Sequence, residues 1–270
     1  MTHSTPIIRL DEVSLTYSSG LFGGRRSAPA LQRVNFEVPR GSITGVVGES
    51  GSGKSTIGKI ILGLLSPDEG RVEVLGENPS NLRGSVWRLH RRRVQAVFQD
   101  SGASLNPRRD VASAIREGLD IHGIGTQAER TETVMNLLED MGLGADYAAR
   151  MPHTLSGGQR QRVNIARALA VEPEVLVADE PVSALDISVQ AQILRLLTDQ
   201  HRNRQLTVVF ISHDLAVVRE TCDRIMVMRR GEVLEAGKTE DIVNRPRHPY
   251  TMELMAGQDF QSPRAGSVDG

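Results

Sequence analysis

The sequence is poor in cysteine, balanced in charge and free of long apolar runs. Cys222 is the only cysteine among its 270 residues, which excludes a framework of internal disulfides and indicates a reducing compartment. The 32 basic and 33 acidic side chains nearly cancel. Because nucleic-acid-binding proteins are usually basic overall, we expect no nucleic-acid partner. No segment approaches the roughly 20 consecutive apolar residues that span a bilayer.

The first ten residues also lack a charged segment followed by a long apolar region, so we expect no secretory signal there. With 39% apolar residues, the chain can build a real core in one large or two small domains. Because no segment is apolar and long enough to span a bilayer, other chains must hold this protein at a membrane if it works there.

The most informative stretch is a glycine-rich loop between a predicted strand, 43–47, and helical spacing at 57–65. It fits the pattern G-x-x-x-x-G-K-[ST], and its glycines allow successive N–H groups to surround a polyphosphate at the positive end of the helix. Lys54 can reach the β- and γ-phosphates, and the Ser55 hydroxyl can hold Mg²⁺. An ordinary turn before a helix would not need Gly-Lys-Ser in that order. The sequence therefore predicts a nucleotide site at Gly48, Ser50, Gly51, Ser52, Gly53, Lys54, Ser55 and Thr56.

A second apolar strand, 175–178, ends in two carboxylates, Asp179 and Glu180. The carboxyl ends of parallel strands face the ligand crevice, where the phosphate loop also lies. There Asp179 would bind Mg²⁺, and Glu180 would act as the base for a water that attacks the γ-phosphate. Taken alone, Asp-Glu-Pro is more typical of a helix cap, so the catalytic interpretation depends on the neighbouring phosphate loop.

The remaining periodicity predicts an α/β fold. Short buried strands at 175–178 and 207–211, with a helix at 189–197 between them, favour a parallel sheet covered by helices. Helical spacing from 110 to 170 indicates a helical subdomain inserted into this core, and 224–236 reads as a hairpin. Further strands are predicted at 8–17, with a break at Asp11-Glu12, and at 31–38, 71–75 and 94–98; the basic block 88–93 is predicted to be a solvated helix end.

A second helix N-terminus suited to an anion begins at Leu155-Ser-Gly-Gly-Gln159 and continues through Ala170. Ser156 can cap this helix, and the two glycine N–H groups can bind an anion. Two phosphate-binding helix ends in one chain pose a question, because the loop at 48–56 already holds a single nucleotide.

With these motifs the chain resembles the ATP-binding subunits of ABC transporters, from about Ile8 to Ala256. Gly48–Ser55 is similar to their Walker A motif, Val175–Glu180 to their Walker B motif and Leu155–Gln159 to their signature. The resemblance implies ATP and Mg²⁺ as ligands. It also implies a single ATPase domain over residues 1–256, with a P-loop core on a mixed sheet, an N-terminal antiparallel β subdomain and the helical subdomain at about 105–170.

In that family, two such domains pair head to tail, and the signature of one caps the γ-phosphate held by the other. This answers the question of the second helix end. The resemblance implies that the ATP of a second ATPase subunit, identical or related, is contacted by Ser156, Gly157, Gly158 and Gln159.

The same resemblance assigns four further positions. Gln99 matches the Q-loop, which touches Mg²⁺ or water and senses the transmembrane partner, and Asp186 matches the D-loop at the dimer interface. His213 matches the switch histidine that contacts the γ-phosphate, and Tyr17 the aromatic that stacks on adenine. Taken singly, Gln99 and His213 would read as ordinary polar strand ends and Tyr17 as an ordinary strand aromatic.

Two segments narrow the resemblance to importers of oligopeptides, dipeptides and nickel: 98–108, after the Q-loop, and the C-terminal element 245–256 with its His-Pro-Tyr-Thr. The glycine-rich insert after Tyr17 is also common in that group. Two permeases and, indirectly, an extracytoplasmic binding protein are the implied partners, at the cytoplasmic face of the inner membrane. Some members carry a C-terminal iron–sulfur centre, but with only Cys222 we expect none here. The tail 257–270 is expected to be disordered.

Other functions remain open at this point. Ribosome-acting ABC-type ATPases usually carry two cassettes in one chain and chromosome-acting ones a long coiled coil, whereas this chain has one cassette and no long heptad run. A P-loop kinase or a regulator that does not hydrolyse ATP is disfavoured by Glu180 and the signature. An exporter is a further alternative, though exporters often fuse this domain to membrane helices.

Overall fold

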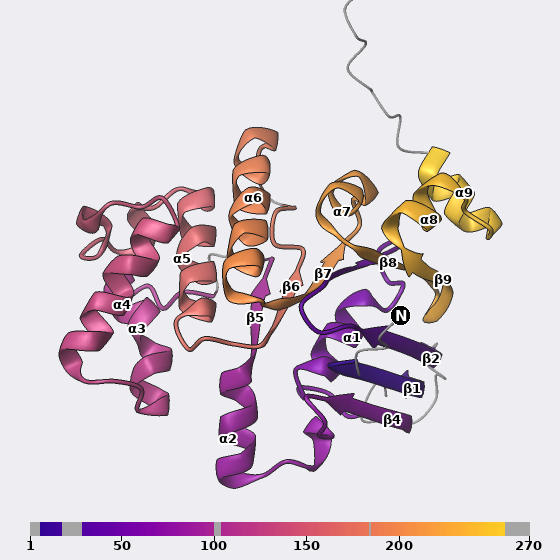
Figure 1. Ribbon diagram of the computed structural model, residues 1–270, viewed down its shortest axis with the longest axis horizontal. Coiled ribbons are helices and arrows are strands. Elements are labelled where there is room, and N and C mark those ends of the chain that lie inside the picture. The colour runs from indigo at the N-terminus through magenta and orange to yellow at the C-terminus, as the bar shows by residue number, and fades with distance from the viewer. Residues whose placement is uncertain (1–5, 18–28, 100–103, 184, 257–270) are drawn as a thin grey trace, which may run out of the picture.

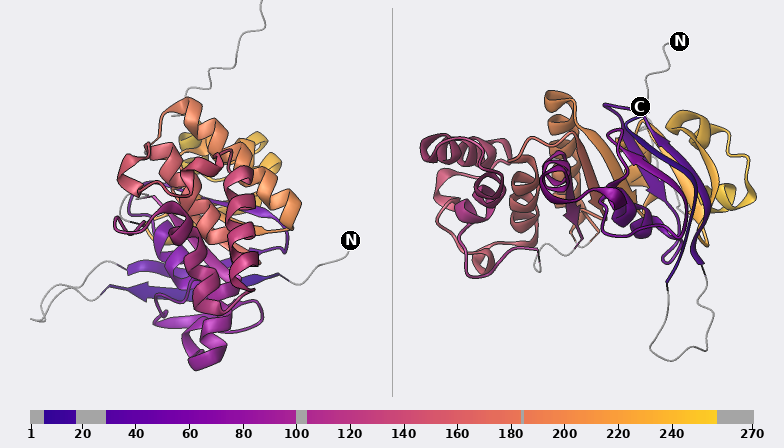
Figure 2. Two further views of the ribbon diagram at one scale, coloured as in Figure 1. Left: turned by 90° about the vertical axis from the view of Figure 1, so that its left-hand side faces the viewer. Right: turned by 90° about the horizontal axis from the view of Figure 1, so that it is seen from below.

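The computed structural model describes residues 6–17, 29–99, 104–183 and 185–256. The insert after Tyr17, part of the segment 98–108 and the tail 257–270, for which we expect disorder, lie outside the described residues. In the described part, the helical subdomain and a small antiparallel sheet lie at opposite ends of the molecule, with a larger sheet between them (Figures 1 and 2).

The small sheet has the order β2-β1-β4 and is antiparallel, formed by β1 (Ile8–Thr16), β2 (Pro29–Val38) and β4 (Glu69–Val74). The break predicted at Asp11-Glu12 is a β-bulge, where the pairing register shifts and Glu12 adopts a φ of 51°. Because the bulge absorbs one extra residue, the apolar side chains on either side of it stay on the buried face. These are Ile8, Leu10, Val13 and Leu15.

The large sheet has six strands in the order β5-β6-β7-β3-β8-β9. The first five are parallel, and β9 runs antiparallel to β8, so the sheet is mixed as expected. Both β3 and β7 are buried along their whole length, as strands covered by helices on both faces must be. The strands are β3 (Ile43–Val47), β5 (Val94–Phe98), β6 (Val175–Asp179), β7 (Thr207–Ser212), β8 (Arg224–Arg229) and β9 (Glu232–Lys238).

Two apolar clusters lie on opposite faces of the large sheet. Successive residues of β7 show this division, because Phe210 belongs to one cluster and Val209 to the other. The cluster of Val209 contains α1 (Lys54–Ile61) and the small sheet, so α1 is packed between the two sheets. Gly58 allows this approach, since a Cβ there would lie 2.9 Å from the Ile211 side chain.

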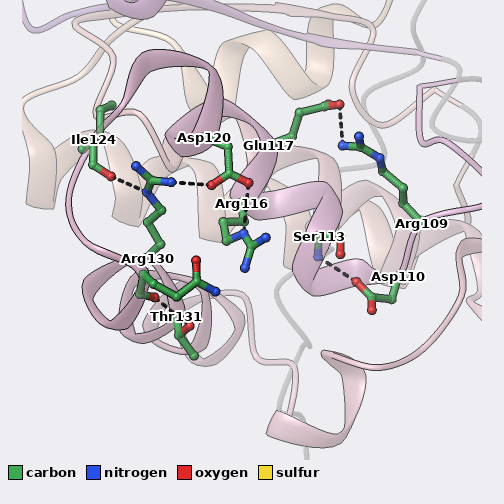
Figure 3. A network of polar contacts seen from close by, with 10 residues as sticks. Arg109, Asp110, Ser113, Arg116, Glu117, Asp120, Ile124, Arg130 and Thr131 are labelled. Carbon is green, nitrogen blue, oxygen red and sulfur yellow. Dashed lines mark hydrogen bonds and ion pairs between the residues drawn. The ribbon is translucent and has the colours of Figure 1, made fainter.

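The cluster of Phe210 extends into the inserted helical subdomain, which is present as expected, and includes helices that cover the same face of the sheet. In the subdomain, the turn between α3 and α4 is held by polar contacts (Figure 3). Arg130 donates to Asp120 at 2.7 Å and to the Ile124 carbonyl oxygen at 2.8 Å. The helices are α3 (Val111–His122), α4 (Gln127–Asp140), α5 (Gly157–Leu169), α6 (Ile187–Arg204) and α7 (Leu215–Thr221).

Three regions differ from the expectation. The helix predicted at 189–197 is α6, which is longer at both ends because Asp186 caps its start and Gln205, at φ 52°, ends it. The basic block ends α2 (Gly84–Arg93), where Arg88 is exposed but Arg93 pairs with Glu174. Two helices that no periodicity indicated follow β9: α8 (Thr239–Asn244), before the C-terminal element, and α9 (Pro249–Ala256), within it. Short 3₁₀ helices lie at Pro79–Asn81, Ala145–Tyr147 and Pro152–Thr154.

Among the described residues, no helix combines the length and apolar character that crossing a bilayer requires.

Phe210 lies at the centre of the large sheet and is 1% exposed. We expect Phe210→Ala to lower the free energy of unfolding by about 3–5 kcal/mol, because the lost ring leaves a cavity. Ile121→Ala, at a side chain on α3 that is 61% exposed, should change it by less than about 0.5 kcal/mol. Urea denaturation of both variants measures the difference, and similar losses would contradict this placement of the core.

Candidate active site

The phosphate loop and the predicted site residues that follow β5, β6 and β7 meet at one edge of the large sheet, where its parallel strands end. The register aligns Phe98 of β5 with Asp179 of β6, and Asp179 with Ile211 of β7. Gln99 therefore follows β5 at the same edge at which Glu180 follows β6. The phosphate loop follows β3 at this edge, because Val47 is aligned with Ser212.

The phosphate loop lies directly against β8. A Cβ on Gly48 would lie 2.1 Å from the carbonyl oxygen of Met228, so any other residue would push the loop away from the sheet. At its other end, Gly53 precedes α1 with a φ of 103°, a left-handed angle that favours glycine. The two glycines thus fix where the loop begins and where α1 starts.

Lys54 is folded back over the loop and is 5% exposed. Its Nζ donates to the carbonyl oxygens of Gly48 at 2.7 Å and of Glu49 at 2.8 Å. Burial lowers the pKa of Lys54, while the carboxylates of Glu180 and Asp179 act in the opposite direction. The loop therefore contains a desolvated cation that a bound polyphosphate would stabilise.

Ser55 connects the phosphate loop to the end of β6, since its Oγ donates to Asp179 Oδ1 at 3.1 Å. Burial raises the pKa of Asp179, and the neighbouring charge of Glu180 raises it further, against the hydrogen bond from Ser55. A hydroxyl and a carboxylate are oxygen ligands that suit Mg²⁺, which takes one or two carboxylates together with phosphate oxygens and waters. The described residues contain no group of three or more His, Cys, Asp or Glu side chains that could hold a metal by themselves.

Glu180 and His213 come together as well. His213 Nδ1 lies 3.2 Å from Glu180 Oε1. Glu180 has a φ of 48°, an uncommon angle for a residue with a side chain, and strain of this kind is held by surrounding bonds. Here the Glu180 N–H donates to the Ile211 carbonyl oxygen at 2.9 Å, and Ser183 Oγ donates to the Glu180 carbonyl oxygen at 3.2 Å.

A cavity of about 390 Å³ lies over the phosphate loop, with Glu180 in its wall. Tyr17 contributes to the lining and is 43% exposed. Its hydroxyl lies 3.3 Å from Thr56 Oγ1. The cavity thus brings together Tyr17, Glu180 and the loop residues Ser50, Gly51, Ser52, Gly53, Lys54, Ser55 and Thr56.

The signature lies elsewhere, because none of its residues is among the described residues that line this cavity. Ser156 caps α5 by accepting from Gln159 N at 3.3 Å, and the Gln159 side chain accepts from Ser156 N at 2.9 Å. Gly158 packs on α6, where a Cβ would lie 2.5 Å from Val189. Asp186 caps α6 at the same place by accepting from Val189 N at 3.0 Å. The folded chain therefore brings the signature to Asp186, not to its own phosphate loop.

Two tyrosines that contact residues of the nucleotide motifs were not predicted as site residues. The Tyr147 hydroxyl accepts from Gln159 Nε2 at 2.9 Å, and the Tyr250 hydroxyl accepts from Glu49 N at 3.2 Å. Neither belongs to a short motif that carries a mechanism. The His-Pro-Tyr-Thr element that contains Tyr250 was noticed, but nothing in its sequence indicates contact with a loop 201 positions earlier.

The sequence profile of the family described as ABC transporter matches residues 31–183 of the chain. This protein belongs to the ABC transporter family. A putative peptide import ATP-binding protein of Brucella ovis is 48% identical over 235 residues, which are 87% of this chain and 74% of that protein. The dipeptide transport ATP-binding protein DppF of Lactococcus lactis subsp. cremoris is 45% identical over 259 residues, 95% of this chain and 82% of that protein.

The fold is also similar to a solved structure, a dimeric ATP-binding cassette in a post-hydrolysis state bound to ADP and Pi. The two chains are 33% identical and superpose with a TM-score of 0.76, over 86% of this chain and 98% of the other. The family and fold expected from the motifs are confirmed, and with them an ATPase of the ABC type.

The raised pKa of Asp179 has a consequence for stability. A folded-state pKa above the ordinary value of 3.8 means that ionisation disfavours the folded state, so stability falls as the pH rises through the folded pKa. We expect Asp179→Asn to raise the free energy of unfolding of the nucleotide-free protein at neutral pH, with the gain disappearing below pH 3.8. Urea denaturation across this pH range measures it.

Asp199→Asn, at an exposed position on α6, is the control and should change the unfolding free energy by less than about 0.5 kcal/mol. A destabilised Asp179→Asn variant at neutral pH would show that the carboxylate is satisfied in the nucleotide-free state.

Proposed function

We propose that this chain is the ATP-hydrolysing subunit of an importer that takes up peptides, a related small solute or nickel through partner permeases. The arrangement of three features at one sheet edge carries the proposal: the buried Lys54, the Ser55–Asp179 bond and the Glu180–His213 pair. The names of the relatives, peptide import and dipeptide transport, favour import over action on ribosomes or chromosomes.

In this proposal, the triphosphate lies over the loop from Gly48 to Thr56, with Lys54 leaving the loop carbonyls for the β- and γ-phosphates. The adenine stacks on Tyr17, which already lines one part of the cavity. Ser55 and Asp179 would hold Mg²⁺, with Gln99 reaching the ion or one of its waters. Bound there, the ion would neutralise the charge of the phosphates during transfer.

Hydrolysis is a transfer of the γ-phosphoryl group to water. Glu180 accepts a proton from the water whose oxygen forms the new bond to phosphorus, and the bond from phosphorus to the bridging oxygen of ADP breaks. His213 contacts the γ-phosphate and orients the Glu180 carboxylate, to which it is already adjacent. Most of the rate enhancement comes from positioning and from charge stabilisation by Lys54.

The proposal includes a second ATPase subunit, identical or related. The separation of the signature from the phosphate loop supports it, because Ser156, Gly157, Gly158 and Gln159 are then free to contact the ATP of the partner. Asp186 lies beside Gly158 through Val189 and would cross the same interface.

Residues 1–256 would form the single ATPase domain. It would bind at the cytoplasmic face of the inner membrane through permeases that dock near Gln99 and the helical subdomain. ATP binding closes the dimer and hydrolysis reopens it, which gives the permeases alternating access. An extracytoplasmic binding protein would deliver the solute.

Glu180→Gln tests the proposed base. The neutral amide cannot accept the proton, so we expect the ATPase rate to fall by about 100-fold or more, while ATP affinity is retained. Phosphate release and ATP titration measure the two quantities, with Glu139→Gln at an exposed position of α4 as the control. A turnover near that of the wild type would rule out Glu180 as the base.

Ser156→Arg tests the shared site. A long cation at the start of α5 blocks the approach of a partner's nucleotide, so hydrolysis should fall to background while the monomer still binds ATP. Ser85→Arg, at an exposed serine of α2, should leave both quantities unchanged. Full hydrolysis in Ser156→Arg would argue that each chain acts alone.

A further inference from the structure

The chain has three tyrosines, and the structure places each hydroxyl within hydrogen-bonding distance of a residue of a nucleotide motif. Tyr17 contacts Thr56, Tyr147 contacts Gln159 and Tyr250 contacts Glu49. Tyr250 differs from the other two because it comes from the C-terminal element, after the last strand of the large sheet. A contact between this element and the phosphate loop therefore connects the end of the fold to its nucleotide site.

The position of Tyr250 is fixed from two sides. The Glu235 carboxylate of β9 accepts from the backbone N–H groups of Arg247 at 3.0 Å and His248 at 3.2 Å, immediately before α9. The Tyr250 side chain is 3% exposed, and the guanidinium carbon of Arg229 lies 4.5 Å from the centre of its ring. A cation over an aromatic face is an attractive contact, so α9 and β8 together hold the ring.

The hydroxyl of Tyr250 meets the beginning of the phosphate loop. It accepts from Glu49 N at 3.2 Å, while Lys54 donates to the carbonyl oxygen of Glu49 on the other side. Further along the loop, the carbonyl oxygen of Ser52 accepts from Gly231 N at 2.9 Å, in the turn between β8 and β9. The β8–β9 hairpin and α9 thus support the loop at two places, and Tyr250 provides the contact to the amide of Glu49.

We propose that Tyr250 is a positioning residue for the phosphate loop and that the C-terminal element, 245–256, is thereby coupled to nucleotide occupancy. Holding Glu49 N fixes the direction in which the chain enters the loop, so that the amides after it are preorganised for a triphosphate. Coupling between two sites is reciprocal, so a bound nucleotide that rigidifies the loop also stabilises α9 in its docked position. The inference rests on the proposed placement of ATP at this loop.

Burial raises the pKa of the Tyr250 phenol, so the group stays a neutral hydroxyl at the pH at which the protein works. It keeps its own proton and accepts from Glu49 N through an oxygen lone pair. The interaction is a neutral hydrogen bond to a backbone amide, and its removal leaves that amide without this acceptor.

Tyr250→Phe removes the hydroxyl and keeps the ring that packs beneath Arg229. We expect the Kd for ATP, measured by calorimetric titration, to rise about three- to tenfold, which is the usual range for one lost neutral hydrogen bond. The KM for ATP should rise with it, while kcat changes by less than about twofold, because Glu180 and His213 are untouched. Met252→Ala, at an exposed position of the same helix, is the matched control and should bind ATP as the wild type does.

Hydrogen exchange gives a readout that a purely structural role would not change. In the wild type, ATP should slow amide exchange in the peptide 249–256, and in Tyr250→Phe this effect of ATP should be lost although the helix still forms. An unchanged Kd in Tyr250→Phe, or equal protection of 249–256 by ATP in both proteins, would overturn the inference.

Lys54→Ala distinguishes a failure of the proposed function from a failure of the proposed role of Tyr250. If it abolishes ATP binding while Tyr250→Phe binds as the wild type, the proposed function stands and the role of Tyr250 is wrong. If Lys54→Ala also binds ATP normally, the placement of ATP at this loop is wrong, and the inference falls with it.

Discussion

The interaction on which the site depends is the pair of hydrogen bonds from Lys54 to the first carbonyls of its own loop. They hold a desolvated ammonium at the point where β3 ends, with Asp179 and Glu180 nearby. Burial makes the cation costly in the absence of an anion, and the N-terminus of α1, directly after the loop, is a place where an anion is stabilised. The large sheet serves this arrangement by aligning the ends of β3, β6 and β7.

The parts of the site that were predictable from the sequence are those defined by local spacing. The loop 48–56 and the carboxylates at 179–180 combine their residue types within a few positions, and the parallel-sheet rule then places them at one edge. His213 was singled out only through the family resemblance, and its closeness to Glu180 was not predicted, because their distance depends on the order of β6 and β7, which no local pattern encodes. The structure places His213 Nδ1 3.2 Å from Glu180 Oε1.

Other features could not be predicted from local sequence patterns, each for a different reason. The C-terminal end of α6 is polar and Ile187 at its start is exposed, so the apolar spacing at 189–197 covers only its buried middle, and its caps extend it. The helix α9 is short and has no marked apolar face of its own, and its position depends on Glu235 and Arg229 from the hairpin. The register shift at Glu12 was visible as a break in alternation, but its nature as a bulge depends on the partner strands.

The position of α1 between the two sheets has a consequence for the thermodynamics of the whole chain. In the proposed function, the N-terminus of α1 receives the nucleotide, while its apolar side chains fill the core that joins the small sheet to the large one. A ligand that binds the folded state raises its stability by mass action, and here that linkage acts on a helix shared by both sheets. Nucleotide binding and the docking of the N-terminal sheet thus both depend on α1, and each stabilises the other.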